Sequence, residues 1–306
     1  MACNASDSDL TRPVSAPESK SVHPIAEKGF NSDQALYENA RPTYPPSVVD
    51  YVKSELVPQL SQSATAKNLT ILDLAAGTGK WTRLLAPLGI KRLVALDPSP
   101  GMRSELEKQA CSSDWPSKEN LEVVDGSATA LPFPDATFDT IFVAQAFHWF
   151  ANVPSLTEMH RVLKSGGQVI LIWNLEDKRT PWVAHLRALQ ERFEGNTPQY
   201  RLGLWRKPFE ELQSVEQVSK MFKLPYVERQ FTHKVVNTSE GVYQRALTKS
   251  YIALLGQTEK AGLKTEFEKV FASEGFPWYE RDGPDGRREK VVDVPLTTDV
   301  ISFCKI

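Results

Sequence analysis

Residues 70–80 have the sequence T-I-L-D-L-A-A-G-T-G-K, and the rest of the chain is interpreted from this stretch outward. A short apolar run carries one carboxylate, Asp73, and leads into a turn of small residues that includes Gly77 and Gly79. The apolar residues after this turn repeat with the period of a helix: Trp81, Leu84, Leu85 and Leu88. The pattern predicts a buried strand, a tight loop and a helix start, where glycines let the backbone approach a ligand and N–H groups face it.

The residues around the glycines indicate which class of ligand the loop can bind. A phosphate-binding P-loop needs Ser or Thr after its lysine, but Lys80 is followed by Trp81. A dinucleotide fingerprint that starts at Gly77 would need its third glycine at the position of Thr82. Asp73 would repel a pyrophosphate and attract a ligand with positive charge. S-adenosylmethionine carries an ammonium and a sulfonium, so it fits this loop better than a nucleotide.

A second carboxylate supports a nucleoside ligand. Residues 92–96, R-L-V-A-L, read as the next strand, and Asp97 follows them at 18 residues after Gly79. A carboxylate at this place can accept hydrogen bonds from both hydroxyl groups of an adenosine ribose. An acid that ends a strand is also a common turn former or helix cap. Together with Asp73 and the glycine loop, the spacing favours the ribose contact.

Four ordered motifs give the chain a resemblance to a known family. They are L-D-L-A-A-G-T-G at 72–79, A-L-D-P-S at 95–99, G-S-A-T-A-L-P-F-P-D-A-T-F-D at 126–139 and R-V-L-K-S-G-G at 161–167. Over residues 30–174 the chain resembles the class I S-adenosylmethionine-dependent methyltransferases. It is most similar to the branch that includes the ubiquinone and menaquinone biosynthesis enzymes and the trans-aconitate methyltransferases.

The resemblance implies an α/β fold with a doubly wound, mostly parallel, Rossmann-like sheet of seven strands and a helical cap insertion. Two positions depart from the family pattern. Ala75 stands where many members have a glycine, and Ser127 stands where many have an aspartate near the adenine. Alanine adds only a methyl group, and serine still accepts a hydrogen bond. The expected cofactor-binding residues are Tyr37, Arg41, Asp73, Ala75, Gly77, Gly79, Asp97, Ser127, Ala128 and Gln145.

The chain divides into four expected segments. They are a disordered tail at 1–24, a cofactor-binding α/β core with an N-terminal lid at 25–174, a helical cap insertion at 175–225, and strands and helices that complete the sheet at 226–306. Within the core, short apolar runs alternate with helical stretches, which predicts βαβ units and a parallel sheet. In the last segment we expect one long amphipathic helix over 238–255. The resemblance implies a last strand antiparallel to the fifth.

The entry to the core matches the form Y-x-x-x-R-P-x-Y-P, which lies over the cofactor pocket in the family that the chain resembles. The matching residues include Tyr37, Arg41 and Tyr44. They predict a lid. The alternative is that both tyrosines are packing aromatics and Arg41 is a surface ion-pair partner.

The segment after the fourth predicted strand, Q-A-F-H-W-F at 145–150, carries the candidate catalytic residue, His148. It emerges at the carboxyl end of a parallel strand, where ligands of doubly wound sheets bind. A histidine there can take a proton from a hydroxyl or an acid, since its pKa lies near neutrality. His148 is thus either a general base or a residue that fixes the loop.

Composition excludes several classes of function. A net charge of −2 gives no support for nucleic-acid binding. The cysteines Cys3, Cys111 and Cys304 are isolated and lack metal-ligand spacing, so we expect neither a metal site nor disulfides, and a cytoplasmic location fits. No run of 18 apolar residues exists that could form a transmembrane helix.

The sequence therefore predicts an enzyme that transfers a methyl group from S-adenosylmethionine to a small molecule, with a carboxylate or hydroxyl oxygen favoured as acceptor. Two alternatives stay open. The same fold and pocket could belong to a non-catalytic cofactor-binding or regulatory protein. An NAD(P)-dependent oxidoreductase is disfavoured by Asp73 and Thr82. The identity of the acceptor and the oligomeric state do not follow from the sequence.

Overall fold

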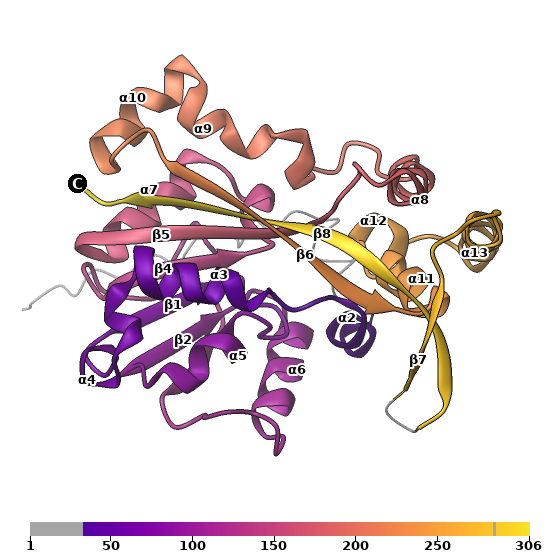
Figure 1. The fold of residues 1–306 in the computed structure, drawn as a ribbon. Coiled ribbons are helices and arrows are strands. Elements are labelled where there is room, and N and C mark those ends of the chain that lie inside the picture. The colour runs from indigo at the N-terminus through magenta and orange to yellow at the C-terminus, as the bar shows by residue number, and fades with distance from the viewer. Residues whose placement is uncertain (1–32, 284–285) are drawn as a thin grey trace, which may run out of the picture.

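The computed structural model describes residues 33–283 and 286–306. The expected tail at 1–24 and the expected start of folded structure near Ile25 lie outside the described residues. One sheet runs through the whole described fold (Figure 1). Its strands are β1 (Thr70–Leu74), β2 (Arg92–Leu96), β3 (Leu121–Val124), β4 (Phe138–Ala144), β5 (Leu163–Glu176), β6 (Val227–Asn237), β7 (Tyr279–Asp282) and β8 (Arg288–Cys304).

The strands lie in the order β3-β2-β1-β4-β5-β8-β6, and β7 pairs with the first residues of β8. The strands from β3 to β5 are parallel, whereas β8 is antiparallel to β5 and to β6. The doubly wound, mostly parallel sheet is confirmed, and β7 joins the seven expected strands as an eighth. Because β1 pairs with β2 on one side and β4 on the other, the winding reverses here, and ligands of such sheets bind beyond the carboxyl ends at this point.

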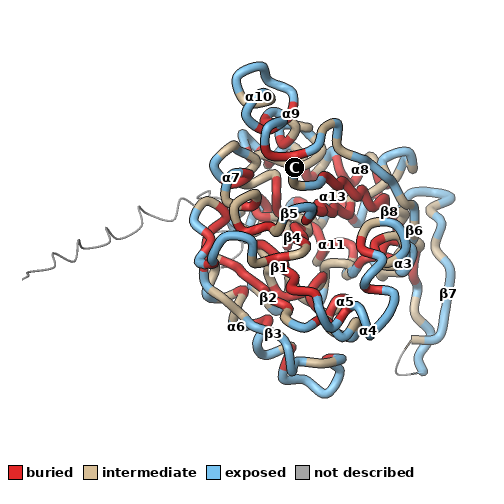
Figure 2. Tube along the Cα trace, turned by 90° about the vertical axis from the view of Figure 1, so that its left-hand side faces the viewer, coloured by how far each residue is buried: buried red, intermediate tan, exposed pale blue. Residues whose placement is uncertain are grey.

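Both faces of the sheet are covered because alternate side chains of a strand point to opposite sides. On β1, Leu72 and Leu74 pack in one core and Ile71 packs in the other. Figure 2 shows β1 as a buried strand. The helices of the first core are α7 (Val153–Val162), α9 (Lys207–Glu210) and α10 (Leu212–Met221). Those of the second are α3 (Pro46–Tyr51), α4 (Ser63–Ala66) and α5 (Thr82–Leu85).

A third core holds the C-terminal part together. Apolar side chains from several helices and from the first half of β8 meet there, including Leu186, Phe267 and Val294. Its helices are α8 (Pro181–Glu191), α11 (Ser239–Leu247), α12 (Ser250–Ala253) and α13 (Gln257–Phe271). The remaining helices, α2 (Gln34–Ala40) and α6 (Pro100–Ala110), lie near the carboxyl ends of β1 and β2 (Figure 1).

Two stretches differ from the sequence-based expectation. The helices within 175–225, expected as one cap, are divided, because α8 packs in the third core while α9 and α10 cover the sheet. The single helix expected over 238–255 is interrupted between α11 and α12, where Lys249 has extended backbone (φ −72°, ψ 130°). This interruption leaves the carbonyl oxygen of Thr248 free to accept a hydrogen bond from Arg41.

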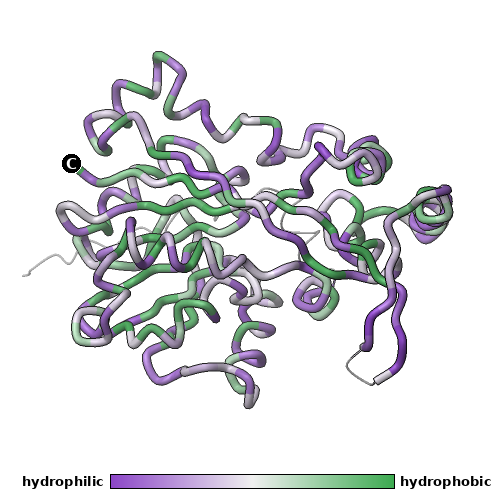
Figure 3. The backbone as a smooth tube through the Cα atoms, viewed as in Figure 1, coloured by the Kyte–Doolittle hydropathy of each residue, from purple (hydrophilic) through white to green (hydrophobic). Residues whose placement is uncertain are grey.

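Hydropathy follows this layering. The inner strands are hydrophobic, whereas the β7–β8 hairpin projects from the body and is hydrophilic (Figure 3). All four residues of β7 are exposed. No helix in the described ranges has the length and apolarity needed to cross a membrane.

Candidate active site

The loop after β1 adopts left-handed backbone at three positions. Ala75 has φ +58°, Gly77 has φ +58° and Gly79 has φ +86°. A Cβ on Gly79 would lie 2.9 Å from Cγ of Leu106, so glycine is required there both for conformation and for space. Ala75 adopts a conformation that costs an alanine about 1–2 kcal/mol. The extra methyl group is thus accommodated, but at a strained position.

Several N–H groups of this loop are used within the protein. Gly77 N donates to Asp97 Oδ2 at 2.9 Å, and Ala76 N donates to the carbonyl oxygen of Leu96 at 3.0 Å. These two hydrogen bonds join the loop to the end of β2 and fix its shape. The N–H groups expected to face the ligand are those of the helix start that follows, and that expectation stays a prediction.

Asp73 lies beneath the loop. It is fully buried, and its Oδ2 accepts a hydrogen bond from Thr82 Oγ1 at 2.6 Å. Burial raises the pKa of Asp73 to about 7, although the hydrogen bonds from Thr82 oppose this rise. Its Oδ1 has no hydrogen-bond partner within the described chain. Thr82, which spoils the dinucleotide fingerprint, therefore has a function of its own as donor to this carboxylate.

Asp97 faces a cavity at the carboxyl ends of β1 and β2. Its Oδ1 accepts from Ser99 N at 2.9 Å and its Oδ2 from Gly77 N at 2.9 Å, which leaves one lone pair on each oxygen. Only 7% of the residue is exposed, and burial raises its pKa to about 6 despite these two hydrogen bonds. Asp97 can thus accept two further hydrogen bonds from a ligand.

The cavity has a volume of about 170 Å³. Of the predicted cofactor-binding residues, those that line it are Tyr37, Arg41, Ala75, Gly77, Asp97 and Gln145. Those that do not line it are Asp73, Gly79, Ser127 and Ala128. Ser127 and Ala128 are buried in the turn after β3.

Helix α2 and the residues after it connect the parts of the site. Thr78 Oγ1 donates to Glu38 Oε2 at 2.5 Å, and Lys80 pairs with Glu38 Oε1 at 3.3 Å. At the other end, Arg41 Nε donates to Thr248 Oγ1 at 2.7 Å. Because the segment joins the glycine loop to α11 and lines the cavity, its position fits the predicted lid. In place of a surface ion pair, Arg41 forms hydrogen bonds with neutral oxygens.

A second cavity, of about 80 Å³, adjoins the first. The two cavities share lining residues, which are Tyr37, Arg41, Gln145, Trp149, Asn174 and Arg245. Cationic side chains from distant parts of the chain line the second cavity: Arg41, Arg187, Arg201, Arg245 and Lys249. The carboxylates that line it are Glu176 and Glu191. Apart from Arg41, the sequence gives no indication of this group, because its members share no local motif.

His148 lines the second cavity and not the first. Its Nδ1 accepts a hydrogen bond from Trp173 Nε1 at 3.1 Å. Burial, reinforced by the nearby Arg41 cation, lowers the pKa of His148 to about 3. The neutral ring then carries its proton on Nε2, because Nδ1 is an acceptor. In this arrangement His148 can donate a hydrogen bond to a ligand, but it lacks a free nitrogen to act as a base.

Comparisons with known proteins identify the class to which this fold and site belong. Residues 72–171 match a family model described as a methyltransferase domain. An uncharacterized methyltransferase-like protein of Schizosaccharomyces pombe is 31% identical over 254 residues, which cover 76% of this chain and 93% of that protein. A demethylmenaquinone methyltransferase of Symbiobacterium thermophilum is 38% identical over 107 residues, covering 33% of this chain and 41% of the enzyme.

Among solved structures, the YcgJ protein of Bacillus subtilis is 21% identical, with 81% of this chain and 98% of that chain covered and a TM-score of 0.46. The match over 93% of the fission yeast protein, at 31% identity, shows that the chain belongs to the methyltransferase family. The prediction of an enzyme that uses S-adenosylmethionine is confirmed. The residues present fit this cofactor, since a buried carboxylate with two free lone pairs, Asp97, faces the cavity beside the glycine loop.

Proposed function

We propose that the protein transfers the methyl group of S-adenosylmethionine to an oxygen of a small molecule, and that this oxygen belongs to a carboxylate. The acceptor occupies the second cavity. The observation that carries the proposal is the continuity of the two cavities, whose shared lining includes Gln145, Trp149 and Arg245. A molecule in the second cavity therefore lies next to one in the first, as in-line transfer requires.

The side chains around the second cavity favour a carboxylate over a hydroxyl group. A hydroxyl acceptor profits from a base, but His148 Nδ1 is occupied by Trp173. Lys249 is protonated at neutral pH, since burial lowers its pKa only to about 8 while Glu176 opposes that shift. Glu176 itself is paired with Lys249. A carboxylate needs no base, because it is ionised at neutral pH.

When bound, S-adenosylmethionine supplies a methyl group that is already activated by the positive sulfur. The protein then has to hold the two molecules in line and exclude water. Asp97 would accept hydrogen bonds from the ribose hydroxyl groups, and the loop around Gly77 would allow the rest of the cofactor to approach the backbone closely. Trp149 and Phe150 provide apolar walls. The Nε2–H group of His148 orients the acceptor by donating a hydrogen bond to it, and no proton has to move when a carboxylate becomes an ester.

The other predicted contacts have corresponding roles in this proposal. Tyr37, Arg41, Ala75 and Gln145 line the cofactor cavity. Asp73, Gly79, Ser127 and Ala128 do not line the cavity. In this proposal Asp73 and Gly79 shape the loop, and Ser127 and Ala128 would border the adenine from the turn after β3. We also propose a small-molecule partner and a cytoplasmic location, in keeping with the net charge of −2 and the isolated cysteines.

A screen with methyl-labelled S-adenosylmethionine and fractionated metabolites tests the proposal. We expect label to enter a small molecule and to be released as methanol by mild alkali, because methyl esters hydrolyse under conditions that leave ethers and methylamines intact. Label that resists alkali would contradict the carboxylate assignment. Cofactor binding without transfer to any fraction would favour the non-catalytic alternative.

A further inference from the structure

We propose that Arg245, together with Arg41 and Lys249, binds an anionic group that the acceptor carries in addition to the oxygen that is methylated. The inference rests on the proposed function and adds the requirement that the acceptor carries a second, anionic group. The acceptor must be anchored by one anion, such as a carboxylate, sulfonate or phosphate, while another part of it faces the cofactor.

The first observation is the unfilled hydrogen-bonding capacity of Arg245. The residue lies on α11, only 6% of it is exposed, and it lines both cavities. One terminal nitrogen lies 3.3 Å from Glu176 Oε1, but its buried Nε has no hydrogen-bond partner in the ranges that the structure describes. A buried N–H of a cation is rarely left without an acceptor, because its desolvation is then uncompensated. The arrangement points to an acceptor atom supplied by a ligand.

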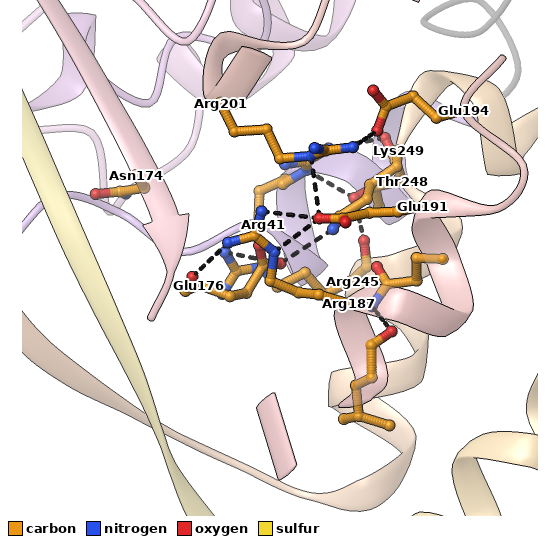
Figure 4. Close-up of polar contacts among 12 residues, drawn as sticks. Arg41, Asn174, Glu176, Arg187, Glu191, Glu194, Arg201, Arg245, Thr248 and Lys249 are labelled. Atoms are coloured by element: carbon orange, nitrogen blue, oxygen red, sulfur yellow. Dashed lines mark hydrogen bonds and ion pairs between the residues drawn. The ribbon is translucent and has the colours of Figure 1, made fainter. Parts of the chain in front are cut away.

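The second observation is the charge balance around the second cavity (Figure 4). Five cationic side chains and two carboxylates line it. Glu191 is shared by Arg187 and Arg201, at 2.9 and 3.0 Å, and Arg201 also pairs with Glu194 behind it. Even when Glu194 is counted, two positive charges remain in excess.

The excess charge lies on the side of Arg41, Arg245 and Lys249. A single carboxylate, Glu176, serves both Arg245 at 3.3 Å and Lys249 at 3.4 Å. Arg41 donates to Thr248 Oγ1 and to the carbonyl oxygen of Thr248, which are neutral. Burial lowers the pKa of Arg245, although Glu176 opposes this shift. The charged form of Arg245 is therefore destabilised in the protein alone, and a bound anion would stabilise it. Buried cations of this kind are stable only when paired, and a ligand completes the pairing.

Anion binding in the presence of S-adenosylhomocysteine tests the inference, because the product cofactor fills the first cavity. Calorimetry and thermal-shift measurements would use acetate, glutarate, citrate and inorganic phosphate at millimolar concentration. The informative variant is Arg245→Lys, which keeps a cation beside Glu176 but removes the Nε–H group. With both proteins saturated with S-adenosylhomocysteine, we expect the best wild-type ligand among these anions to bind at least tenfold more weakly to the variant.

Two further variants make the test independent of the folding of Arg245→Lys. Lys249→Gln should weaken the same anion several-fold, because it removes one of the excess charges. Arg179→Gln is the matched control, since Arg179 pairs with Asp177 on the surface and lines neither cavity, and it should leave anion affinity unchanged. Failure of all four anions to bind the wild type, or equal affinity in Arg245→Lys, would overturn the inference. Retained S-adenosylhomocysteine binding in that case would leave the methyltransferase assignment intact.

Discussion

Replacing Thr82 by valine tests how the glycine loop is supported. The two side chains have nearly the same shape, so the substitution removes the 2.6 Å hydrogen bond to Asp73 Oδ2 without opening a cavity. Both residues are completely buried, so no water takes the place of the hydroxyl group. A hydrogen bond to an ionised group contributes about 1.5–3 kcal/mol, and one between neutral groups about 0.5–1.5 kcal/mol. The expected loss of stability therefore depends on the ionisation of Asp73.

The direction of the pH effect follows from the pKa of Asp73. Burial raises this pKa from 3.8 to about 7, so ionisation destabilises the folded state increasingly as the pH rises from about 4 to 7. Removing the Thr82 donor raises the folded-state pKa further and extends this loss to higher pH. We expect the valine variant to lose about 1 kcal/mol more at pH 8.5 than at pH 5.5.

Urea unfolding of the wild type and of Thr82→Val at these two pH values measures the difference directly. Thr78→Val is a useful comparison, because Thr78 is also buried but donates to Glu38 of the lid and not to Asp73. The loss of stability in Thr78→Val should therefore be the same at pH 5.5 and pH 8.5 as far as Asp73 is concerned. Equal losses at both pH values in Thr82→Val would refute the argument that Asp73 titrates near pH 7 in the folded protein.

Two further predictions concern the loop and the histidine. Gly79→Ala should destabilise the protein by about 2–3 kcal/mol, because the new methyl group adds a close contact with Leu106 to the strain of left-handed backbone. Gly77→Ala should cost about 1–2 kcal/mol, because its new methyl group meets no atom within 4 Å. Similar losses for the two variants in urea unfolding would argue against the steric explanation. His148→Asn can keep an acceptor for Trp173 but loses the Nε2–H group, so kcat/KM should fall about tenfold with the shape of its pH profile unchanged. A wild-type break near pH 6.5 that disappears in the variant would restore His148 as a base.

The part of the site that is continuous in sequence could be predicted from the sequence. The strand, loop and helix around Gly77 and Gly79 form a local pattern, and Asp97 follows at a fixed distance because β2 lies beside β1. The sequence indicates that Asp73 matters to the loop, but it does not indicate the orientation of the side chain. Its side chain turns under the loop because the hydroxyl group of Thr82 meets it there.

The cationic cavity could not be predicted, because its residues meet only through tertiary structure. Glu176 ends the long strand β5, and Arg245 lies on α11, far along the chain. Lys249 was hidden within a helical pattern that gave no sign of the interruption between α11 and α12. Likewise, β7 consists of exposed residues without apolar alternation, so periodicity gave no signal for it.

Calorimetric titration with S-adenosylmethionine, comparing the wild type with Asp97→Ala and Asp125→Ala, measures whether Asp97 holds the cofactor. Asp125 follows β3 and pairs with Arg103, but it does not line the cavity, so it serves as the matched control. We expect micromolar binding by the wild type and by Asp125→Ala. Asp97→Ala should bind about 10- to 100-fold more weakly, because about 1.4–3 kcal/mol of hydrogen bonding to a charged acceptor is lost. Equal affinity in all three folded proteins, or no binding by the wild type, would contradict the account.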